Sequence, residues 1–265
     1  MPGRIAEMNH RPRKRFGQHF LADASFLSKI VDAIAPQAGD TLVEIGPGLG
    51  ALTRPLLDRL SQLHVVEIDR DLAAKLRAEF PADRLVVHEA DALRFDFSSL
   101  PAPLRVAGNL PYNISTPLLF HVAQFADRIA DMHFMLQKEV VDRMTAAPST
   151  PDYGRLTVML RSRFDMRRLF TVPPGAFRPP PKVDSAVVRM TPLRALPHPG
   201  VSTPRFEVLV TRAFGQRRKT LRNSLSELAQ ENDFAAAGID PGLRAENLDV
   251  LAFARLAQAI AQGSP

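Results

Sequence analysis

The sequence predicts an α/β fold, with a Rossmann-like domain around a mostly parallel central sheet and then a small C-terminal domain made only of helices. Helix-like and strand-like segments alternate between Ser25 and Leu136, and the strand-like segments are apolar on both faces. Such strands are typical of parallel sheets that carry helices on each side. A proline-rich linker at Pro192–Pro204 precedes a tail with helical periodicity. We therefore expect an α/β domain over residues 25–194 and a helical domain over residues 205–265.

The individual elements follow from periodicity and from boundary residues. Phe26–Ile34 is apolar at helical spacing, and Thr41–Ile45 is a short apolar strand. Leu49–Leu60 has a helical pattern, although Pro55 should restrict its first turns or kink it. Further strands are expected at His64–Ile68, Leu85–His88, Leu104–Ala107, Met132–Leu136, Leu169–Val172 and Ala186–Met190, and further helices at Leu72–Phe80, from Ser115 onward, at Glu139–Met144, at Leu156–Ser162 and over Phe206–Gln262.

The composition is that of a globular protein with an anionic partner. Its 265 residues suffice for one large domain or for one domain with a small companion, and 45% of them are hydrophobic. The formal net charge is +6, and a basic arm is expected over residues 1–24. A basic protein favours partners such as nucleic acid, because its cations release counterions from phosphates.

Several classes of protein are excluded by what the sequence lacks. It has no cysteine, which excludes disulfides, thiol nucleophiles and cysteine-bound zinc, and we predict no metal site. No apolar run is long enough for a signal peptide or a membrane span. We therefore expect a cytoplasmic protein with no membrane partner, and nothing in the sequence requires more than a monomer.

A glycine-rich turn follows the first strand of the predicted sheet. Gly46 and Gly48 allow the turn to pass close to a ligand beside a helix N-terminus. Glu67, about 20 residues further on, ends the next strand and can accept hydrogen bonds from ribose hydroxyls. These features fit a nicotinamide-dependent oxidoreductase as well as a methyltransferase, so both interpretations stay open at this point.

Two later features favour a methyltransferase that acts on adenine. Asp91 follows the third predicted strand, where it can bind an adenine amine while Ile68 and Ala92 flank the ring. The fourth predicted strand ends in the sequence Asn-Leu-Pro-Tyr, Asn109–Tyr112. The second feature is the stronger one, because its residue types match the chemistry that an adenine amine requires.

The amine of adenine is a poor nucleophile, because its lone pair is delocalised into the ring. The Asn109 side-chain oxygen and the Leu110 carbonyl can accept its two N–H bonds, and Pro111 would fix the direction of that carbonyl. Tyr112 offers a ring on which a flipped base can stack. The sulfonium of S-adenosylmethionine already activates the methyl group, so the protein mainly has to align the reactants.

These residues together resemble the bacterial KsgA and eukaryotic Dim-type small-subunit ribosomal RNA adenine dimethyltransferases. The resemblance implies the methyltransferase form of the fold, with S-adenosyl-L-methionine as cofactor and S-adenosylhomocysteine as product. It implies N6-dimethylation of two adjacent adenines near the 3′ end of small-subunit ribosomal RNA, with the small ribosomal subunit as partner. The matching segments are Arg15–Leu21, Glu44–Gly50, Val66–Asp69, Asp91–Ala92, Gly108–Ser115 and Gly175–Val187.

The resemblance also assigns roles to residues. It implies that Asn109 lies between cofactor and target base, and that Phe177 forms a second aromatic wall against that base. His19 departs from the family pattern, since many relatives carry Asn there, although imidazole can also donate or accept a hydrogen bond. The implied cofactor-binding residues are His19 and Leu21 at the methionine end, Gly46 and Gly48 through their backbone, Glu67 at the ribose, Ile68, Asp91 and Ala92 at the adenine, and Asn109.

A basic segment in the helical tail is the predicted RNA contact. It contains Arg217, Arg218, Lys219 and Arg222, and a continuous helix would place Arg218 and Arg222 one turn apart on a shared face. Such side chains bind phosphates, which position RNA without reading its sequence.

Other functions fit parts of the sequence. The large-subunit ribosomal RNA adenine methyltransferases of macrolide resistance share the Asn-x-Pro-Tyr-type motif, although Phe16–Gln18 and Gly215–Asn223 look more like the small-subunit class. A ribosome-assembly factor with weak or lost catalysis is a second alternative, which the intact Asn109 and Tyr112 argue against. A nicotinamide oxidoreductase leaves Asn109–Tyr112 unexplained, and a DNA adenine methyltransferase would lack a base-reading domain.

Overall fold

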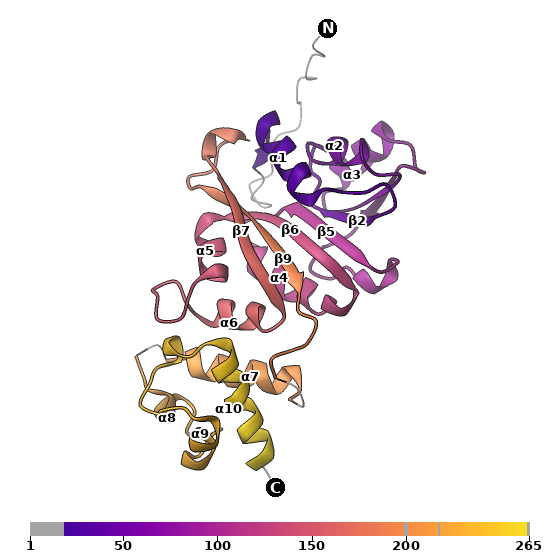
Figure 1. Cartoon of the computed structure of the whole chain (residues 1–265). Helices are drawn as coiled ribbons and strands as arrows, with labels where there is room; N and C mark the ends of the chain where they lie inside the picture. The colour runs from indigo at the N-terminus through magenta and orange to yellow at the C-terminus, as the bar shows by residue number, and fades with distance from the viewer. Residues whose placement is uncertain (1–18, 199–200, 217, 264–265) are drawn as a thin grey trace.

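The computed structural model describes residues 19–198, 201–216 and 218–263, so the basic arm before residue 19 and Arg217 lie outside it. Within these residues, seven strands form one sheet in the order β4–β3–β2–β5–β6–β9–β7 (Figure 1). Neighbours from β4 to β6 are parallel, whereas β9 is antiparallel to both β6 and β7. The predicted α/β fold with a mostly parallel sheet is confirmed. The strands are β2 (Thr41–Ile45), β3 (Leu63–Glu67), β4 (Leu85–Glu89), β5 (Leu104–Asn109), β6 (Ile129–Gln137), β7 (Phe164–Val172) and β9 (Ser185–Pro192).

Helices cover both faces of this sheet, as the two-sided apolar strands predict. One core joins the sheet to the first three helices, and another joins its opposite face to the next three. Adjacent strand residues alternate between these cores, as Leu42 and Val43 do in β2. The helices are α1 (Ala24–Ile34), α2 (Thr53–Leu57) and α3 (Arg70–Glu79) on the first face, and α4 (Ser115–Ala123), α5 (Lys138–Thr145) and α6 (Arg155–Arg161) on the second.

Several elements differ in extent from their predictions, and α2 and β7 differ most. Helix α2 is shorter than the predicted Leu49–Leu60, and Pro55 lies in its first turn, where a missing N–H breaks no helical bond. Strand β7 is longer than the predicted Leu169–Val172. It is an edge strand whose exposed positions carry polar residues such as Asp165 and Arg167, so an apolar run marks only part of it.

One short ladder near the cavity described below was not predicted. Strand β1 (Phe20–Leu21) pairs antiparallel with β8 (Phe177–Arg178), and Leu21 lies opposite Phe177. The Ala22 amide also donates to the Ala176 carbonyl at 2.8 Å. The ladder therefore ties the segment before α1 to the proline-rich segment before β9.

The C-terminal helices lie beyond one end of the sheet (Figure 1), and their core around Phe206, Phe234 and Phe253 also includes Val158 and Met159 of α6. The Tyr153 hydroxyl, from the segment before α6, donates to the Leu248 carbonyl at 2.8 Å and joins the two parts. No helix in the described part of the chain is long and apolar enough to span a membrane. The helices are α7 (Thr203–Phe214), α8 (Leu221–Ser224), α9 (Glu231–Ala237) and α10 (Val250–Gly263).

The prediction that Arg218 and Arg222 share one helical face is wrong. Helix α7 ends at Phe214 and α8 begins only at Leu221, so Arg218 lies in the connection between them. Gly215 follows the last residue of α7, and glycine has low helix propensity.

Candidate active site

A large open cavity lies at the carboxyl ends of the parallel strands β2, β3 and β5. Its empty volume is about 1070 Å³, including the part open to solvent. Ligand sites in open α/β sheets form at this edge, because parallel strands deliver the residues that follow them to one place. The predicted residues that line the cavity are His19, Gly46, Gly48, Glu67, Ile68, Asp91, Ala92, Asn109, Leu110, Pro111 and Tyr112.

The glycine turn after β2 forms one side of the cavity. Gly48 has a φ of +58°, in the left-handed region that favours glycine. A Cβ atom at this position would lie only 2.9 Å from the Phe20 ring. The turn therefore needs glycine both for its backbone conformation and for its close contact with β1.

Glu67 ends β3 with its carboxylate already held in place. Its Oε2 atom accepts from the Gly48 amide at 3.2 Å, and Oε1 accepts from the Asp69 amide at 2.9 Å. Burial raises the pKa of Glu67, while these amide bonds act in the opposite direction. Each carboxylate oxygen can accept more than one hydrogen bond, so both can still bind a ligand hydroxyl.

Asp91 and Ile68 lie beside Glu67 at the same edge. One carboxylate oxygen of Asp91 accepts from the Leu93 amide at 2.9 Å, which fixes the turn after β4. The Ala90 amide donates to the Glu67 carbonyl at 3.0 Å, so the ends of β3 and β4 stay together. Ile68 is 49% exposed, so its apolar side chain offers a surface for a flat ring.

Asn109 is the last residue of β5 and is part-buried. Its side-chain nitrogen donates to the His19 carbonyl at 2.9 Å, and no residue in the described ranges donates to its side-chain oxygen. The Leu110 amide donates to the Met135 carbonyl at 3.1 Å, which continues the β5–β6 pairing past the strand end. Gly108 is required just before this turn, because a Cβ there would lie 2.5 Å from the Ile45 carbonyl oxygen.

Tyr112 lines the cavity, and its side chain makes two contacts. Its ring stacks on the His19 imidazole, with ring centroids 5.7 Å apart and planes inclined by 28°. Its hydroxyl lies 2.7 Å from the Ser185 hydroxyl. Burial raises the pKa of Tyr112, so the phenol stays neutral at physiological pH.

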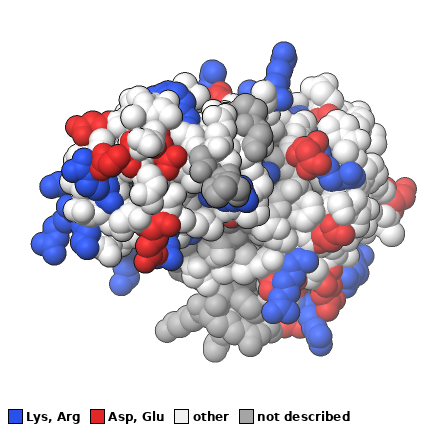
Figure 2. Space-filling model, turned by 90° about the horizontal axis from the view of Figure 1, so that it is seen from below, with Lys and Arg blue, Asp and Glu red and all other residues white. Residues whose placement is uncertain are grey.

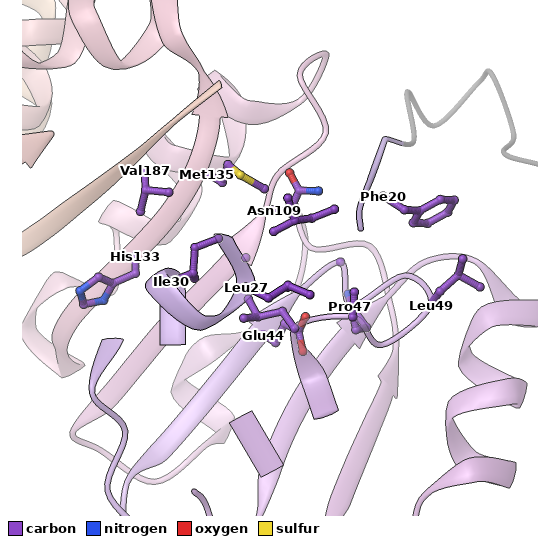
Figure 3. A pocket seen from close by; sticks show the side chains of 15 residues that line it. Phe20, Leu27, Ile30, Glu44, Pro47, Leu49, Asn109, His133, Met135 and Val187 are labelled. Carbon is purple, nitrogen blue, oxygen red and sulfur yellow. The ribbon is translucent and has the colours of Figure 1, made fainter. Parts of the chain in front are cut away.

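Leu21 does not line this cavity but a smaller one beside it, with an empty volume of about 500 Å³. Phe20, Gly46 and Asn109 line both cavities. Figure 3 shows the smaller cavity. The Asn109 and Glu44 side chains lie near the middle of the view, and His133 lies on the side away from Phe20. Leu21 therefore borders an extension of the main cavity behind the glycine turn.

Glu44 is a buried carboxyl group in this smaller cavity, and no role was predicted for it. The Thr53 hydroxyl donates to its Oε2 atom at 2.6 Å. Burial raises the pKa of Glu44 to about 7. Glu44 could have been predicted as a site residue from the sequence, because it is an acidic residue within a mainly apolar strand.

Phe177 does not lie where the sequence predicts, and its role as an aromatic wall of the cavity needs correction. Its side chain is fully buried and belongs to the core under α1, with Leu21 and Val172. The reason is the β1–β8 ladder, which covers Phe177 with the segment before α1. Its observed contacts are those of a core residue.

The predicted RNA-binding residues that the structure describes are exposed but do not form one continuous row. Arg218 and Lys219 are exposed, whereas the Arg222 guanidinium donates to Glu231, with a shortest distance of 2.7 Å. Figure 2 views the molecule from the end that carries the C-terminal helices, where Lys and Arg gather toward the edges and are mixed with acidic residues. Arg218 and Lys219 are therefore the better candidates for phosphate contacts.

The chain is similar to known proteins over almost its whole length. Residues 9–262 match the family model described as "Ribosomal RNA adenine dimethylase". The chain is 62% identical to the ribosomal RNA small subunit methyltransferase A of Aromatoleum aromaticum, over 97% of each protein. It is 64% identical to the protein of that name from Thiobacillus denitrificans, over 91% of this chain and 94% of the relative.

Crystal structures of more distant proteins share the fold. A dimethyladenosine transferase from Plasmodium falciparum has a TM-score of 0.73 at 26% identity, over 90% of this chain and 96% of that one. The 23S rRNA methyltransferase ErmE has a TM-score of 0.72 at 28% identity, over 92% of this chain and 100% of that one. The chain belongs to the ribosomal RNA adenine dimethylase family.

Proposed function

We propose that this protein uses S-adenosylmethionine to dimethylate the N6 amines of two adjacent adenines near the 3′ end of small-subunit ribosomal RNA. The observation that carries this proposal is the position of Asn109, which opens on the same cavity as Glu67 and Tyr112. The small-subunit substrate is favoured over a large-subunit one, because the relatives above 60% identity carry small-subunit names. The similarity to ErmE is one of fold at much lower identity.

The residues around the glycine turn fit the cofactor. Glu67 has both carboxylate oxygens oriented at the rim, as two ribose hydroxyls require. Asp91 would bind the adenine amine, and the exposed face of Ile68 would cover the adenine ring. Leu21 and His19 would border the methionine end. When bound, the cofactor supplies a methyl group on a positively charged sulfur.

The target amine would be held by the segment after β5. The Asn109 side-chain oxygen and the Leu110 carbonyl would accept its two N–H bonds, which directs the lone pair toward the methyl carbon. Tyr112 would stack on the extruded base, an interaction worth about 1–3 kcal/mol per base. Leu110 is buried and Pro111 restricts the backbone, so this segment can keep its orientation without the substrate.

The RNA around the target would lie against the basic arm and the helical part of the chain. We assign the catalytic domain to residues 25–194 and the RNA-contacting domain to residues 205–265, with Arg218 and Lys219 at phosphates. A ribosomal substrate places the protein in the cytoplasm, and the reaction requires only one copy of the chain.

The test is transfer of labelled methyl groups to undermethylated small subunits, to naked small-subunit RNA and to large subunits, with the modified positions mapped. We expect the wild-type protein to label two adjacent adenines near the 3′ end of small-subunit RNA. The Asn109→Ala variant should transfer no label although it is expressed at the wild-type level. Label on large-subunit RNA alone would contradict the substrate assignment. Tight binding of small subunits without any label would favour the assembly-factor alternative.

A further inference from the structure

Tyr112 is held to the sheet through its hydroxyl, which contacts the hydroxyl of a buried serine in β9. The Tyr112 and Ser185 oxygens are 2.7 Å apart, although the two residues are 73 positions apart in the chain. Ser185 is fully buried at the first position of β9, and it pairs with Gln137 of β6 and Val172 of β7. The bond therefore joins the cavity wall to a strand that is paired on both sides.

The rest of Tyr112 is much less constrained. It lies in the turn between β5 and α4, and its ring can rotate about two side-chain bonds. The other side-chain contact described for it is the His19 ring, which lies toward the cavity. A base that stacks on this face would compete with the His19 ring for it, whereas the Ser185 bond, at the hydroxyl end of the ring, would remain.

We propose that Ser185 is a positioning residue for methyl transfer, which holds the Tyr112 ring at the place where the target adenine stacks. The proposal rests on the proposed function, since it assumes that Tyr112 stacks on the base. Ser185 touches neither substrate nor cofactor in this scheme. It acts because a ring anchored at both its Cβ and its hydroxyl cannot swing about the Cα–Cβ bond, so the stacking surface stays beside the methyl group.

The surroundings of Ser185 explain why the anchor is rigid. The Asp184 carbonyl, just before it, accepts from the Lys138 amide at 2.9 Å, which fixes the entry to β9. Because Ser185 lies between two paired strands, it cannot follow a movement of the turn that carries Tyr112.

The test is a double-mutant cycle on Ser185 and Tyr112, with transfer rates measured at saturating S-adenosylmethionine. Ser185→Ala and Tyr112→Phe each remove one partner of the same bond, and we expect each to slow transfer about tenfold. The double variant should be no slower than either single one, because the bond is already lost. Ser185→Thr keeps the hydroxyl and should restore most of the rate, and cofactor affinity should stay unchanged throughout.

Ser162→Ala is the matched control, since Ser162 is also buried and its hydroxyl donates to the Met159 carbonyl at 2.8 Å. Equal rates for Ser185→Ala and Ser162→Ala, or rate losses that multiply in the double variant, would overturn the proposal. If Ser185→Ala does not fold, as a thermal melt would reveal, Tyr112→Phe and Ser185→Thr still test it. A wild-type protein that transfers no label contradicts the proposed function instead, which separates the two failures.

Discussion

The Glu67 carboxylate and the Gly48 amide are joined by a hydrogen bond of 3.2 Å, which links the end of β3 to the glycine turn after β2. The Asp69 amide holds the other carboxylate oxygen at 2.9 Å. The acceptor is therefore oriented before a ligand arrives, so little order has to be created when the ligand binds. The first two predictions concern this pair.

Replacing Glu67 by Ala should weaken S-adenosylmethionine binding about 10- to 100-fold, because hydrogen bonds to a charged group contribute about 1.5–3 kcal/mol. Isothermal titration with the cofactor measures this directly. The control is Glu227→Ala, a highly exposed carboxylate on the helical tail. An affinity as high as that of the control variant would remove Glu67 from the cofactor site.

Replacing Gly48 by Ala should lower both cofactor affinity and the free energy of unfolding. The new methyl group would lie 2.9 Å from the Phe20 ring, on a backbone with a φ of +58°. Gly39→Ala is the matched control, because no atom lies within 4 Å of a Cβ built there. Denaturant melts and cofactor titrations of both variants give the comparison. Equal unfolding free energies and equal cofactor affinities would mean that the turn accommodates the methyl group without strain.

The positions of Glu67, Asp91 and Asn109 could be predicted because each lies at or just after the carboxyl end of a strand in a parallel sheet. The spacing of apolar residues and the polar residues at the boundaries indicate the strands, and the parallel topology then brings their carboxyl ends to one edge. No knowledge of distant contacts is needed for that step. The same reasoning cannot find Ser185, whose partner is 73 residues away and whose side chain carries no pattern of its own.

The position of the Phe177 side chain could not be predicted from the motif that contains it. Its burial depends on a ladder of two residues per strand, which is too short to leave a periodic signal. Arg218 and Arg222 show the same limit for helices, since a short break after Gly215 removes the shared face that their spacing predicts.

The buried position of Phe177 leads to a third prediction. Phe177→Ala should destabilise the fold by about 3–5 kcal/mol, as large-to-small changes in a core do, whereas Phe177→Leu should fold and keep transfer within a few-fold of wild type. Tyr112→Leu is the contrasting variant, because it removes a ring from the cavity wall and should abolish most transfer. If Phe177→Leu were as inactive as Tyr112→Leu in a stable protein, Phe177 would have to meet the base after all.

A fourth prediction concerns the connection between α7 and α8. Arg218→Glu with Lys219→Glu should weaken RNA binding at least tenfold and reduce the dependence of affinity on salt, by about one unit of slope per lost contact. Cofactor affinity should not change. Arg59→Glu with Lys75→Glu alters the net charge equally on the other part of the chain and serves as control. Equal losses in both double variants would indicate a general charge effect without a local contact.

The last prediction concerns Glu44, which is buried beneath the glycine turn with one hydrogen bond from Thr53. Burial raises its pKa from 4.5 to about 7 in the folded protein, so the folded state binds this proton more tightly than the unfolded chain does. Linkage then makes the free energy of unfolding fall as the pH rises from about 4.5 to about 7, and level off above that.

Glu44→Gln keeps an acceptor for Thr53 and cannot ionise, so it lacks this contribution. The variant should therefore gain stability relative to wild type as the pH increases through that window, with little difference below pH 4.5. Urea melts at half-unit pH steps measure the difference between the two curves, in which the contributions of other titrating groups largely cancel. Parallel curves from pH 4 to pH 8 would show that Glu44 has an ordinary pKa, with solvent reaching it behind the turn.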